Sequence, residues 1–535
     1  MKKIFTILLS LIILTSCGAN SETTSNADFQ SSYKSGEPLR IVAGSENKEL
    51  EPIIEEYAKA NKQNIEIDYL GSLDIMRMIG TEDITYDAVW PASSIWLNLG
   101  DTNHILKYAE TTSQSPVVFG IKKSLAQDLG FMDRDVETRE IIDAIKSGKL
   151  KFTMTSATQS NSGASAYLGF LQSLAKDKKG LTSDDLADEN IKEQITSLLS
   201  GVERSSGSSN WLVDLFLSGD YDAMVNYEQL IIATNQKLEE EGKEPLYIVY
   251  PSDGLSISDS PIAYVDKGDS QKEEAFRKFR DYLLSDDAQS KIEKTGKRSA
   301  FGTVRETNRA VYKSDWGIDL DKTLSPVRLP KADVIMQALN MYQTEFKKPA
   351  FTIYVLDYSG SMHDNNGYTQ MLEAMNQVLV PENAKANLLL GTEKDYTVLI
   401  PFSEEILGTI TADGNGEDLN KIYEDLKDNY APETSTYMYE AIIKAVNILN
   451  DNKAKLDNYS PAIVVLSDGR PNGAATFDDL EAAYSDLDYD VPIFSIMFGD
   501  AEQSDLEEIA NMSRARVFDG RTDMIKAFQN VKGYN

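Results

Sequence analysis

Three oxygen-bearing side chains follow a strongly apolar stretch in the C-terminal third of the chain. The segment FTIYVLDYSGSM has the pattern of a buried strand, and Asp357, Ser359 and Ser361 stand at its end. Alternate residues of an extended turn point the same way, so these side chains can converge on one point beyond the carboxyl end of the strand. In an open α/β sheet, ligands bind at that edge. The spacing therefore predicts a binding site there.

Two further polar residues hold equivalent places in the same third. Thr436 opens the helical stretch TYMYEAIIKAVNIL, and Asp468 ends the strand-like segment AIVVLSD. All five residues offer oxygen, the donor that hard cations such as Mg²⁺, Mn²⁺ and Ca²⁺ prefer, and none offers the nitrogen or sulfur that suits zinc. The set predicts a site for a hard divalent cation.

These motifs resemble the metal-ion-dependent adhesion site (MIDAS) of the von Willebrand factor A (VWA) family. The similarity lies in DYSGS, the threonine of TSTYMYEAI and the aspartate of LSDG, and the order of strands and helices agrees over the final third of the chain. It implies that Ser359, Ser361 and Thr436 supply hydroxyl ligands. Asp357 and Asp468 would then ligate the ion directly or through water.

The resemblance also implies how such a site binds a partner. Hydroxyl ligands do not neutralise the cation, so an Asp or Glu carboxylate of a protein partner can fill an open position on the metal. Mg²⁺ is the expected ion, with Mn²⁺ or Ca²⁺ as alternatives. Thr434 and Ser435 stand where many relatives have two glycines, so the loop before Thr436 can differ in shape.

Other metal chemistry and catalysis find little support in the sequence. His104 and His363 are the two histidines and Cys17 is the one cysteine, so a zinc site is not expected. Residues 413–417 begin like a calcium loop but lack its glycine and terminal glutamate at the required positions. No serine nucleophile stands in a motif with a histidine partner. We therefore expect a binding protein and not an enzyme.

The length of the chain indicates how many domains to expect, and its net charge argues against one class of partner. The 535 residues exceed what one hydrophobic core organises, so about two or three domains are expected. The net charge of −32 argues against nucleic acid, because phosphate binding requires clustered Lys and Arg.

The first residues have the pattern of an export signal. Lys2 and Lys3 precede an apolar run over residues 4–14, which is too short for a stable membrane span. The run leads into LTSC, which ends at Cys17 and resembles the lipobox of bacterial lipoproteins. An ordinary secretory signal with an incidental cysteine is the alternative.

The lipobox resemblance implies a division of the N-terminus. Residues 1–16 would be a signal peptide, Cys17 the lipidated first residue, and residues 17–38, which are rich in Ser, Asn and Thr, a flexible tether. Membrane attachment would then be by lipid alone, with the folded mass held outside the cytoplasm of a bacterial cell.

From Leu39 onward, short apolar strands alternate with amphipathic helices. This alternation predicts an α/β fold with mostly parallel sheets. A second alternation begins near residue 349 and runs to the C-terminus. We expect one domain over residues 39–315, a linker and connecting helix over 316–348, and a second domain over 349–535.

The first of these domains resembles the type II periplasmic solute-binding proteins. The resemblance rests on LRIVAGSENKELEPIIEEYAK, SPVVFGIKKSLAQDLG, SNSGASAYLGFL, VNYEQLI and SPIAYVDKGDSQKEEAFRKFRDYLLSDDAQ. It implies two α/β lobes that close over a small solute by a hinge. The predicted architecture is a two-lobed solute-binding-like domain followed by a Rossmann-like, doubly wound VWA domain.

Hydroxyl-rich turns at strand–helix junctions are candidate contacts to a solute. Helix N-termini expose unpaired N–H groups that can hold a carboxylate or another oxyanion. Ser and Asn in these places also act simply as helix caps. Two polar residues farther along can point into the same cleft, where a glutamate would oppose a bare anion. The candidates are Ser45, Ser93, Ser94, Ser160, Asn161, Ser162, Tyr227 and Glu228.

Two functions fit this reading. The leading hypothesis is a cell-surface interaction protein, in which the C-terminal domain recognises an acidic group through its metal and the N-terminal domain is a sensor or recognition module. The alternative is the solute receptor of an ABC-type uptake system, with the C-terminal domain serving for docking. The alternative requires residues 39–315 to bind a small solute saturably.

Overall fold

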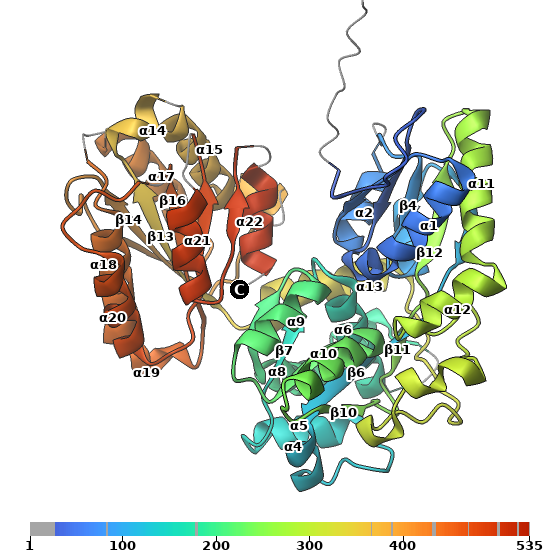
Figure 1. Cartoon of the computed structure of the whole chain (residues 1–535). Helices are drawn as coiled ribbons and strands as arrows, with labels where there is room; N and C mark the ends of the chain where they lie inside the picture. Colours follow the sequence, from blue (N-terminus) through green and yellow to red (C-terminus); the bar gives the residue numbers. More distant parts are fainter. Residues whose placement is uncertain are drawn as a thin grey trace, which may run out of the picture.

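The computed structural model describes residues 27–81, 84–176, 180–364, 366–386, 389–430, 435–468, 470–499, 503–521 and 524–533. Over these ranges the chain forms three six-stranded sheets (Figure 1). Two sheets form the two lobes of the N-terminal part, and the third forms the C-terminal domain. None of the helices in these ranges is long and apolar enough to cross a membrane.

The first lobe is built on a sheet with strand order β1-β3-β2-β4-β12-β5. Leu39 and Ile41 point into its core and Arg40 points to solvent, as the alternation of a half-covered strand requires. Phe276 and Phe279 of α11 close the same core. The elements of this lobe are β1 Phe29–Gln30, β2 Leu39–Ala43, η1 Ser45–Leu50, α1 Glu51–Asn61, β3 Ile65–Tyr69, α2 Ser72–Ile79, β4 Ala88–Trp90, α3 Ser94–Gly100, β5 Leu106–Thr111, β12 Pro261–Val265, α11 Ser270–Leu283 and α12 Asp286–Lys294.

The second lobe has strand order β10-β6-β9-β7-β8, with β11 also pairing with β6. A Cβ atom on Gly120 of β6 would lie 2.8 Å from Ile231, so only glycine lets α10 pack this closely on the sheet. The elements are β6 Ser115–Lys122, α4 Lys123–Asp128, α5 Thr138–Lys146, β7 Phe152–Thr155, α6 Asn161–Leu174, α7 Ser183–Leu186, α8 Glu189–Leu199, β8 Val202–Ser206, α9 Ser209–Ser218, β9 Ala223–Tyr227, α10 Glu228–Glu240, β10 Leu246–Val249 and β11 Ser256–Ser258.

The sheets of both lobes are mixed, so the expectation of mostly parallel sheets is wrong for this part of the chain. β2 runs parallel to β3 and β4, but β12 is antiparallel to β4 and β5. In the second lobe, β6 is antiparallel to β9, β10 and β11. The chain crosses to the second lobe after β5 and returns at β12. The strands that follow these two crossings are β6 and β12. Each enters its sheet from the other lobe and not through a helix packed on the same sheet, which is the connection that makes neighbouring strands parallel.

The segment between the lobes and the C-terminal domain is packed against the second lobe. Trp316 is fully buried, and its Nε1 donates a hydrogen bond to Glu239 at 2.9 Å. Val334 and Leu339 of α13 belong to the core of the second lobe, and Tyr167 there donates to the carbonyl of Ala338 at 2.8 Å. The elements are η2 Glu306–Val311, η3 Ser314–Trp316, α13 Ala332–Met341 and the π-helical turn η4 Tyr342–Phe346.

The C-terminal domain has strand order β15-β14-β13-β16-β17-β18, and all its neighbours are parallel except β14 and β15. Ile353 and Val355 face a core shared with α18, α20 and α21, whereas Tyr354 and Leu356 face one shared with α15, α17 and α22. Helices on both faces make the domain doubly wound, as predicted. The elements are β13 Ala350–Asp357, α14 Gly360–Asp364, α15 Gly367–Leu379, α16 Pro381–Ala386, β14 Tyr396–Phe402, β15 Ile410–Asp413, α17 Asp418–Asn429, α18 Met438–Asp451, α19 Lys453–Leu456, β16 Ser460–Ser467, α20 Phe477–Leu487, β17 Ile493–Met497, α21 Gln503–Met512, β18 Val517–Asp519 and α22 Met524–Gly533.

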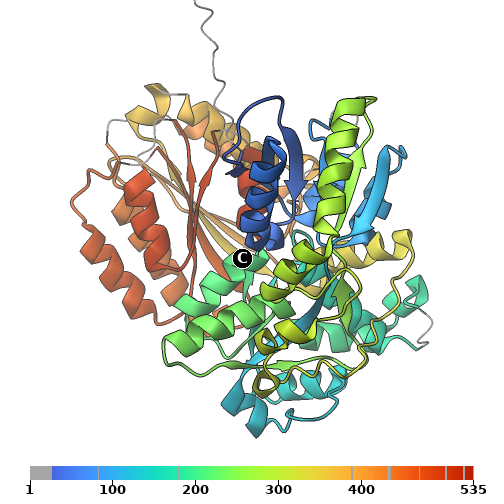
Figure 2. The ribbon, with the colours of Figure 1, turned by 45° about the vertical axis from the view of Figure 1, so that its right-hand side comes forward.

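The C-terminal domain touches both lobes (Figure 2). Its Asp490 pairs with Arg204 of the second lobe at 2.8 Å. Helix α22 reaches the first lobe, where Lys526 pairs with Asp74. Ion pairs therefore join the C-terminal domain to each of the two lobes.

Candidate functional site

The candidate metal site lies where the strand order of the C-terminal sheet reverses. The chain passes from β13 to β14 on one side and adds β16 on the other, so a topological switch point falls between β13 and β16. Asp357 ends β13 and Asp468 directly follows β16. The Ser361 hydroxyl donates to Asp468 Oδ1 at 2.9 Å and lies 3.1 Å from the Ser359 hydroxyl. The backbone N–H of Ser359 donates to Asp357 Oδ1 at 2.8 Å.

Burial sets the electrostatics of these acids. Asp357 and Ser359 are fully buried and Asp468 is 6% exposed, whereas Ser361 faces solvent. Burial raises the pKa of Asp357 to about 6; hydrogen bonds from Ser467 and Ser359 oppose the rise and the nearby charge of Asp468 adds to it. Buried carboxylates that repel one another favour a cation between them.

Thr436 lies at the same rim of the sheet. It stands two residues before α18 and not inside it. Its N–H donates to Asn472 Oδ1 at 2.8 Å, and its carbonyl accepts from the N–H of Asn472 at 3.0 Å. The next residue, Tyr437, donates to the carbonyl of Ser403, which follows β14. The loops after β14 and β16 thus fix the segment that carries Thr436. Thr434 lies outside the described residues.

Asn472 is a positioning residue that the sequence did not reveal. Its side chain and backbone both hold Thr436, which is 36 positions away. An asparagine in a glycine-containing turn predicts only local turn formation. Nothing in the sequence indicates the long-range pairing.

The donors at this rim fit a hard cation. They comprise two carboxylates and three hydroxyls, all oxygen ligands suited to Mg²⁺. Within the part of the chain that the structure describes, no group of three or more His, Cys, Asp or Glu side chains is placed to hold a metal. The set at the rim has only two acids, so the hydroxyls must complete it. His363, six residues beyond Asp357, is exposed.

In the N-terminal part, Asn161 connects the two lobes. Its Nδ2 donates to the Tyr227 hydroxyl at 2.9 Å and to Ser258 at 2.7 Å, and its Oδ1 accepts from Trp96 of the first lobe at 2.6 Å. A Cβ atom on Gly163 would lie 2.1 Å from the carbonyl oxygen of Thr155, so glycine lets the first turn of α6 approach the end of β7. Asn161 and Tyr227 are thereby brought together, and both are buried.

Ser160 and Ser162 belong to a buried hydroxyl cluster. Their hydroxyls lie 3.1 and 2.8 Å from the hydroxyl of Ser209, the first residue of α9. Ser162 also lies 2.8 Å from the hydroxyl of Thr155. These hydroxyls therefore bond mainly to one another within the second lobe.

The remaining serine candidates lie where the first lobe meets other segments. The Ser45 hydroxyl is 3.3 Å from that of Ser208 in the second lobe. Ser93 caps α3, and the N–H of Ser94 donates to Asp259 Oδ1 at 2.8 Å. The two lobes contact one another directly at these candidates.

Glu228 forms a buried ion pair. Its carboxylate accepts two hydrogen bonds from the guanidinium of Arg298, at 2.8 and 2.7 Å, and one from Tyr250. It is 0% exposed. Its charge is therefore neutralised inside the protein.

Three further polar residues lie near the contact between the two lobes and were not predicted from the sequence. Glu46 Oε1 and Gln229 Oε1 are buried and have no hydrogen-bond partner within the described part of the chain. Gln229 Nε2 donates to the carbonyl of Glu46 at 3.1 Å. Lys297 is 1% exposed. Burial lowers its pKa to about 8, although Glu46 acts in the opposite direction. Polar and charged residues on amphipathic segments predict a solvent-exposed face, so the sequence gives no sign that these three are buried.

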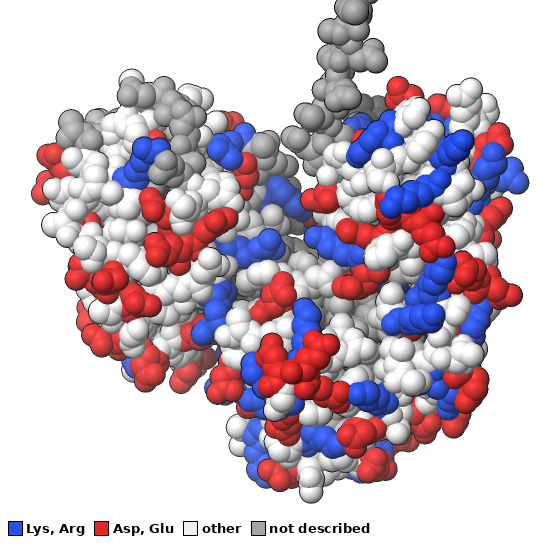
Figure 3. Space-filling view, viewed as in Figure 1, with Lys and Arg blue, Asp and Glu red and all other residues white. Residues whose placement is uncertain are grey.

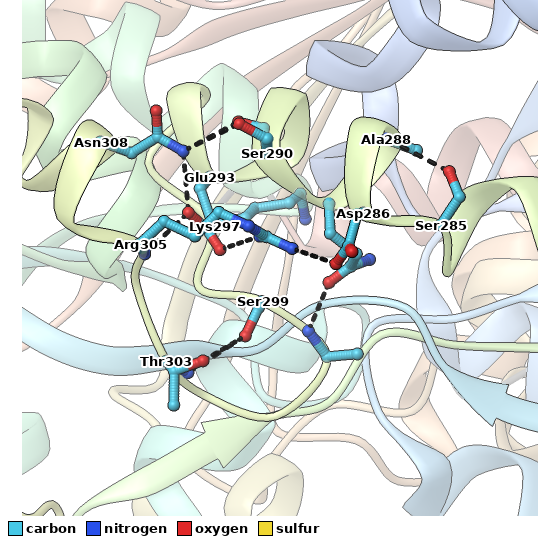
Figure 4. Close-up of polar contacts among 12 residues, drawn as sticks. Ser285, Asp286, Ala288, Ser290, Glu293, Lys297, Ser299, Thr303, Arg305 and Asn308 are labelled. Carbon is cyan, nitrogen blue, oxygen red and sulfur yellow. Dashed lines mark hydrogen bonds and ion pairs between the residues drawn. The ribbon is translucent and has the colours of Figure 1, made fainter.

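The turn that carries Lys297 is held by a network behind it (Figure 4). Buried Glu293 of α12 binds the side chain and N–H of Arg305, and Asn308 Nδ2 donates to it at 2.8 Å. This network fixes the end of α12 against η2 and so fixes the position of Lys297. The predicted lipid attachment residue, Cys17, lies outside the described residues.

Two family models match separate parts of the chain. Residues 39–298 match the model of bacterial extracellular solute-binding proteins, and residues 353–531 match that of the von Willebrand factor type A domain. The chain joins a solute-binding-like domain to a VWA domain. The extracellular character of the first family agrees with a location outside the cytoplasm.

Solved structures similar to the solute-binding-like domain have low sequence identity. The periplasmic binding protein AfuA from Actinobacillus pleuropneumoniae, with fructose-6-phosphate bound, is 15% identical with a TM-score of 0.44 over 57% of this chain and 98% of AfuA. The ferric binding protein from Campylobacter jejuni is 15% identical, with a TM-score of 0.42 over 57% and 98%. A periplasmic thiamin binding protein is 13% identical, with a TM-score of 0.45 over 57% and 95%. Among curated proteins, none matches the chain.

Proposed function

We propose that the chain is an extracytoplasmic interaction protein whose VWA domain binds an acidic group of a protein partner through a divalent cation. The observation that carries the proposal is the hydrogen-bonded set of Asp357, Ser359, Ser361 and Asp468 at the switch point of the sheet. Three of these side chains are buried and Ser361 is exposed, so a partner would reach the site from the side of Ser361.

The charge of each side chain suggests its role in holding the ion. Ser359, Ser361 and Thr436 would hold the ion through neutral oxygens, and Asp357 and Asp468 would contact it directly or through water. A bound Mg²⁺, or Mn²⁺ or Ca²⁺ in its place, would supply an electrophilic position for an incoming carboxylate. Because the hydroxyls leave most of the ion's charge uncompensated, the partner's carboxylate gains that interaction.

A capture experiment with and without chelator tests this function. The purified chain is immobilised and exposed to native cell-surface proteins in Mg²⁺ or in EDTA, in parallel with Ser359→Ala. We expect a partner that is retained in Mg²⁺ and lost both in EDTA and with Ser359→Ala. The matched control is Ser485→Ala, which removes an exposed hydroxyl on α20. Retention of the same partner by Ser359→Ala in EDTA would contradict the proposal.

The solute-binding-like domain is proposed as the sensor or recognition module. The buried, unpartnered oxygens of Glu46 and Gln229, together with buried Lys297, favour a small solute with both donor and acceptor groups. A thermal-shift screen with amino acids tests this idea. We expect a stabilising solute whose effect is lost in Lys297→Met and kept in Lys294→Met, the exposed control at the end of α12, three residues earlier.

The same residues also favour a second candidate function, that of a solute receptor for an uptake system. Under that function residues 39–315 bind solute saturably, and the VWA domain serves for docking to the uptake system. A partner captured in Mg²⁺ that is not part of an uptake system would favour the first candidate, and a stabilising solute without such a partner would favour the second.

The proposed attachment to the membrane is through lipid on Cys17. The LTSC segment supports this proposal. In a bacterial host, Cys17→Ala should move the protein from the membrane fraction to the soluble fraction. Equal membrane retention of both forms would contradict it.

A further inference from the structure

A cavity of about 320 Å³ lies between the second lobe, the connecting segment and the C-terminal domain. Arg204 of β8 lines it from the lobe, Lys347 and Lys348 line it from the connecting segment, and Asp490 and Arg514 line it from the C-terminal domain. Asp490 and Arg514 precede β17 and β18, so the cavity meets the amino ends of the strands. The candidate metal site lies at the opposite rim.

The walls of the cavity carry more positive than negative charge. Five of its side chains are cationic and four are acidic, in a chain whose net charge is −32. One of the acids, Asp220, pairs with Lys122 at 3.0 Å, and another, Glu203, lies 3.7 Å from Lys151 of the same wall. Figure 3 shows basic side chains on both sides of the hollow between the C-terminal domain and the rest of the molecule.

The two arginines are incompletely satisfied. Arg204 NH1 and Arg514 NH2 both donate to Asp490 Oδ1 at 2.8 Å, so two guanidinium groups share one carboxylate. The Nε atoms of both arginines are buried, and neither has a hydrogen-bond partner among the residues that the structure describes. Arg204 is 5% exposed. Two guanidinium charges with one shared carboxylate leave an excess of positive charge in this wall, and a negative charge in the cavity would offset it.

The lysines of the connecting segment form no ion pair with an acidic side chain of the described residues. Lys348 forms no hydrogen bond or ion pair with any described residue. Burial, and then the nearby charge of Lys151, lower its pKa, and the more distant charges of Asp457 and Glu203 oppose this only in part. Lys347 donates to the carbonyl oxygen of Lys532 at 3.1 Å, and burial lowers its pKa to about 8. A negative charge in the cavity would stabilise both ammonium groups.

We propose that this cavity binds a small anion with at least two negative charges, of the phosphate ester or polycarboxylate class. The ammonium groups of Lys347 and Lys348 supply its donors, and Arg204 and Arg514 add positive charge to the same walls. The volume falls at the lower end of ligand pockets, which is about 300 Å³, so a compact anion fits and a polymer does not. Because the walls come from the lobe, the connecting segment and the C-terminal domain, the bound anion ties these parts together.

Isothermal titration calorimetry of the purified full chain at pH 8 tests the site. Inorganic phosphate and citrate are titrated separately, which distinguishes the phosphate from the carboxylate source. We expect saturable binding of at least one of them at one site. We also expect proton uptake, seen when the binding heat varies with the ionisation heat of the buffer, because the anion raises the pKa values of the lysines.

Three variants test whether the anion binds in this cavity. Lys348→Met should weaken binding about tenfold or more, corresponding to about 1.4 kcal/mol. Lys348→Arg should retain it. Lys278→Met removes an equal charge from the surface of α11, where Lys278 pairs with Glu274, and should bind like the wild type. Unchanged binding in Lys348→Met, or no saturable binding of either anion, overturns the proposal.

Titrations in Mg²⁺ and in EDTA distinguish failure of the anion-site proposal from failure of the metal-site proposal. Anion binding should be the same in Mg²⁺ and in EDTA, because the cavity and the candidate metal site lie at opposite rims of the sheet. Anion binding that disappears in EDTA would overturn the cavity proposal, and loss of metal-dependent partner capture alone would leave it intact.

Discussion

At the carboxyl ends of β13 and β16, buried acids and neutral hydroxyls gather, whereas the amino ends of β16, β17 and β18 face a cavity rich in Lys and Arg. At the first rim, Ser361 donates to Asp468, and the carboxylates of Asp357 and Asp468 are both buried. At the second, Arg204 and Arg514 share Asp490 and negative charge is short. We therefore propose that the two rims of one sheet bind ions of opposite charge. The residues of the candidate metal site come from one domain, whereas the cationic cavity requires three parts of the chain.

Asp490→Asn should have the largest effect on stability. It leaves Arg204 and Arg514 without their shared carboxylate, and breaking a buried pair in this way costs about 3–5 kcal/mol. The value here should be toward the lower end, because the Asp490 side chain is 27% exposed. Chemical denaturation measures the change. Asp488→Asn, two residues away and 92% exposed, is the control and should change the stability by less than about 0.5 kcal/mol.

Asp357→Asn should abolish measurable Mg²⁺ binding, which we expect as a loss of about 100-fold or more, or about 2.7 kcal/mol. The substitution removes a carboxylate and keeps the shape of the side chain. Calorimetric titration with MgCl₂ measures it, with the exposed Asp478→Asn as the control. If phosphate binding fell together with Mg²⁺ binding, the two rims would not be independent.

Ser361→Ala should have a smaller effect at the same rim. It removes one neutral donor and the hydrogen bond to Asp468, so we expect Mg²⁺ affinity to fall about tenfold, or about 1.4 kcal/mol. The same titration applies, and Ser485→Ala should match the wild type. A loss as large as that of Asp357→Asn would mean that Ser361 acts mainly by positioning Asp468.

Lys347→Met should alter how stability depends on pH at the opposite rim. The folded pKa of Lys347 is about 8, below its ordinary value of 10.5, so between these pH values the unfolded chain binds more protons and stability rises with pH. Without Lys347 this rise should shrink, by about 1 kcal/mol between pH 8 and pH 9 and by no more than about 1.4 kcal/mol per pH unit. Denaturation at several pH values measures it, with exposed Lys394→Met as the control. Identical slopes in both variants would contradict the lowered pKa.

Much of the architecture could be predicted from the sequence because it rests on local patterns. The apolar strand before Asp357, the alternation along β13 and the order of strands and helices define a doubly wound sheet whatever surrounds it. Asp357, Ser359 and Ser361 are close in sequence, so the rim on which they lie follows from the strand that precedes them.

The strand directions of the lobes and the cationic cavity depend on contacts between distant residues. Period-two patterns are identical for parallel and antiparallel strands, so the return of β12 beside β4 and β5 left no trace in the pattern. Asn472 holds Thr436 across 36 positions, and Arg204 meets Asp490 across 286. Sequence determines which elements form and which ends carry polar groups. Only the packing of those elements decides which charges are buried together, because burial and pairing depend on neighbours that the chain brings from afar.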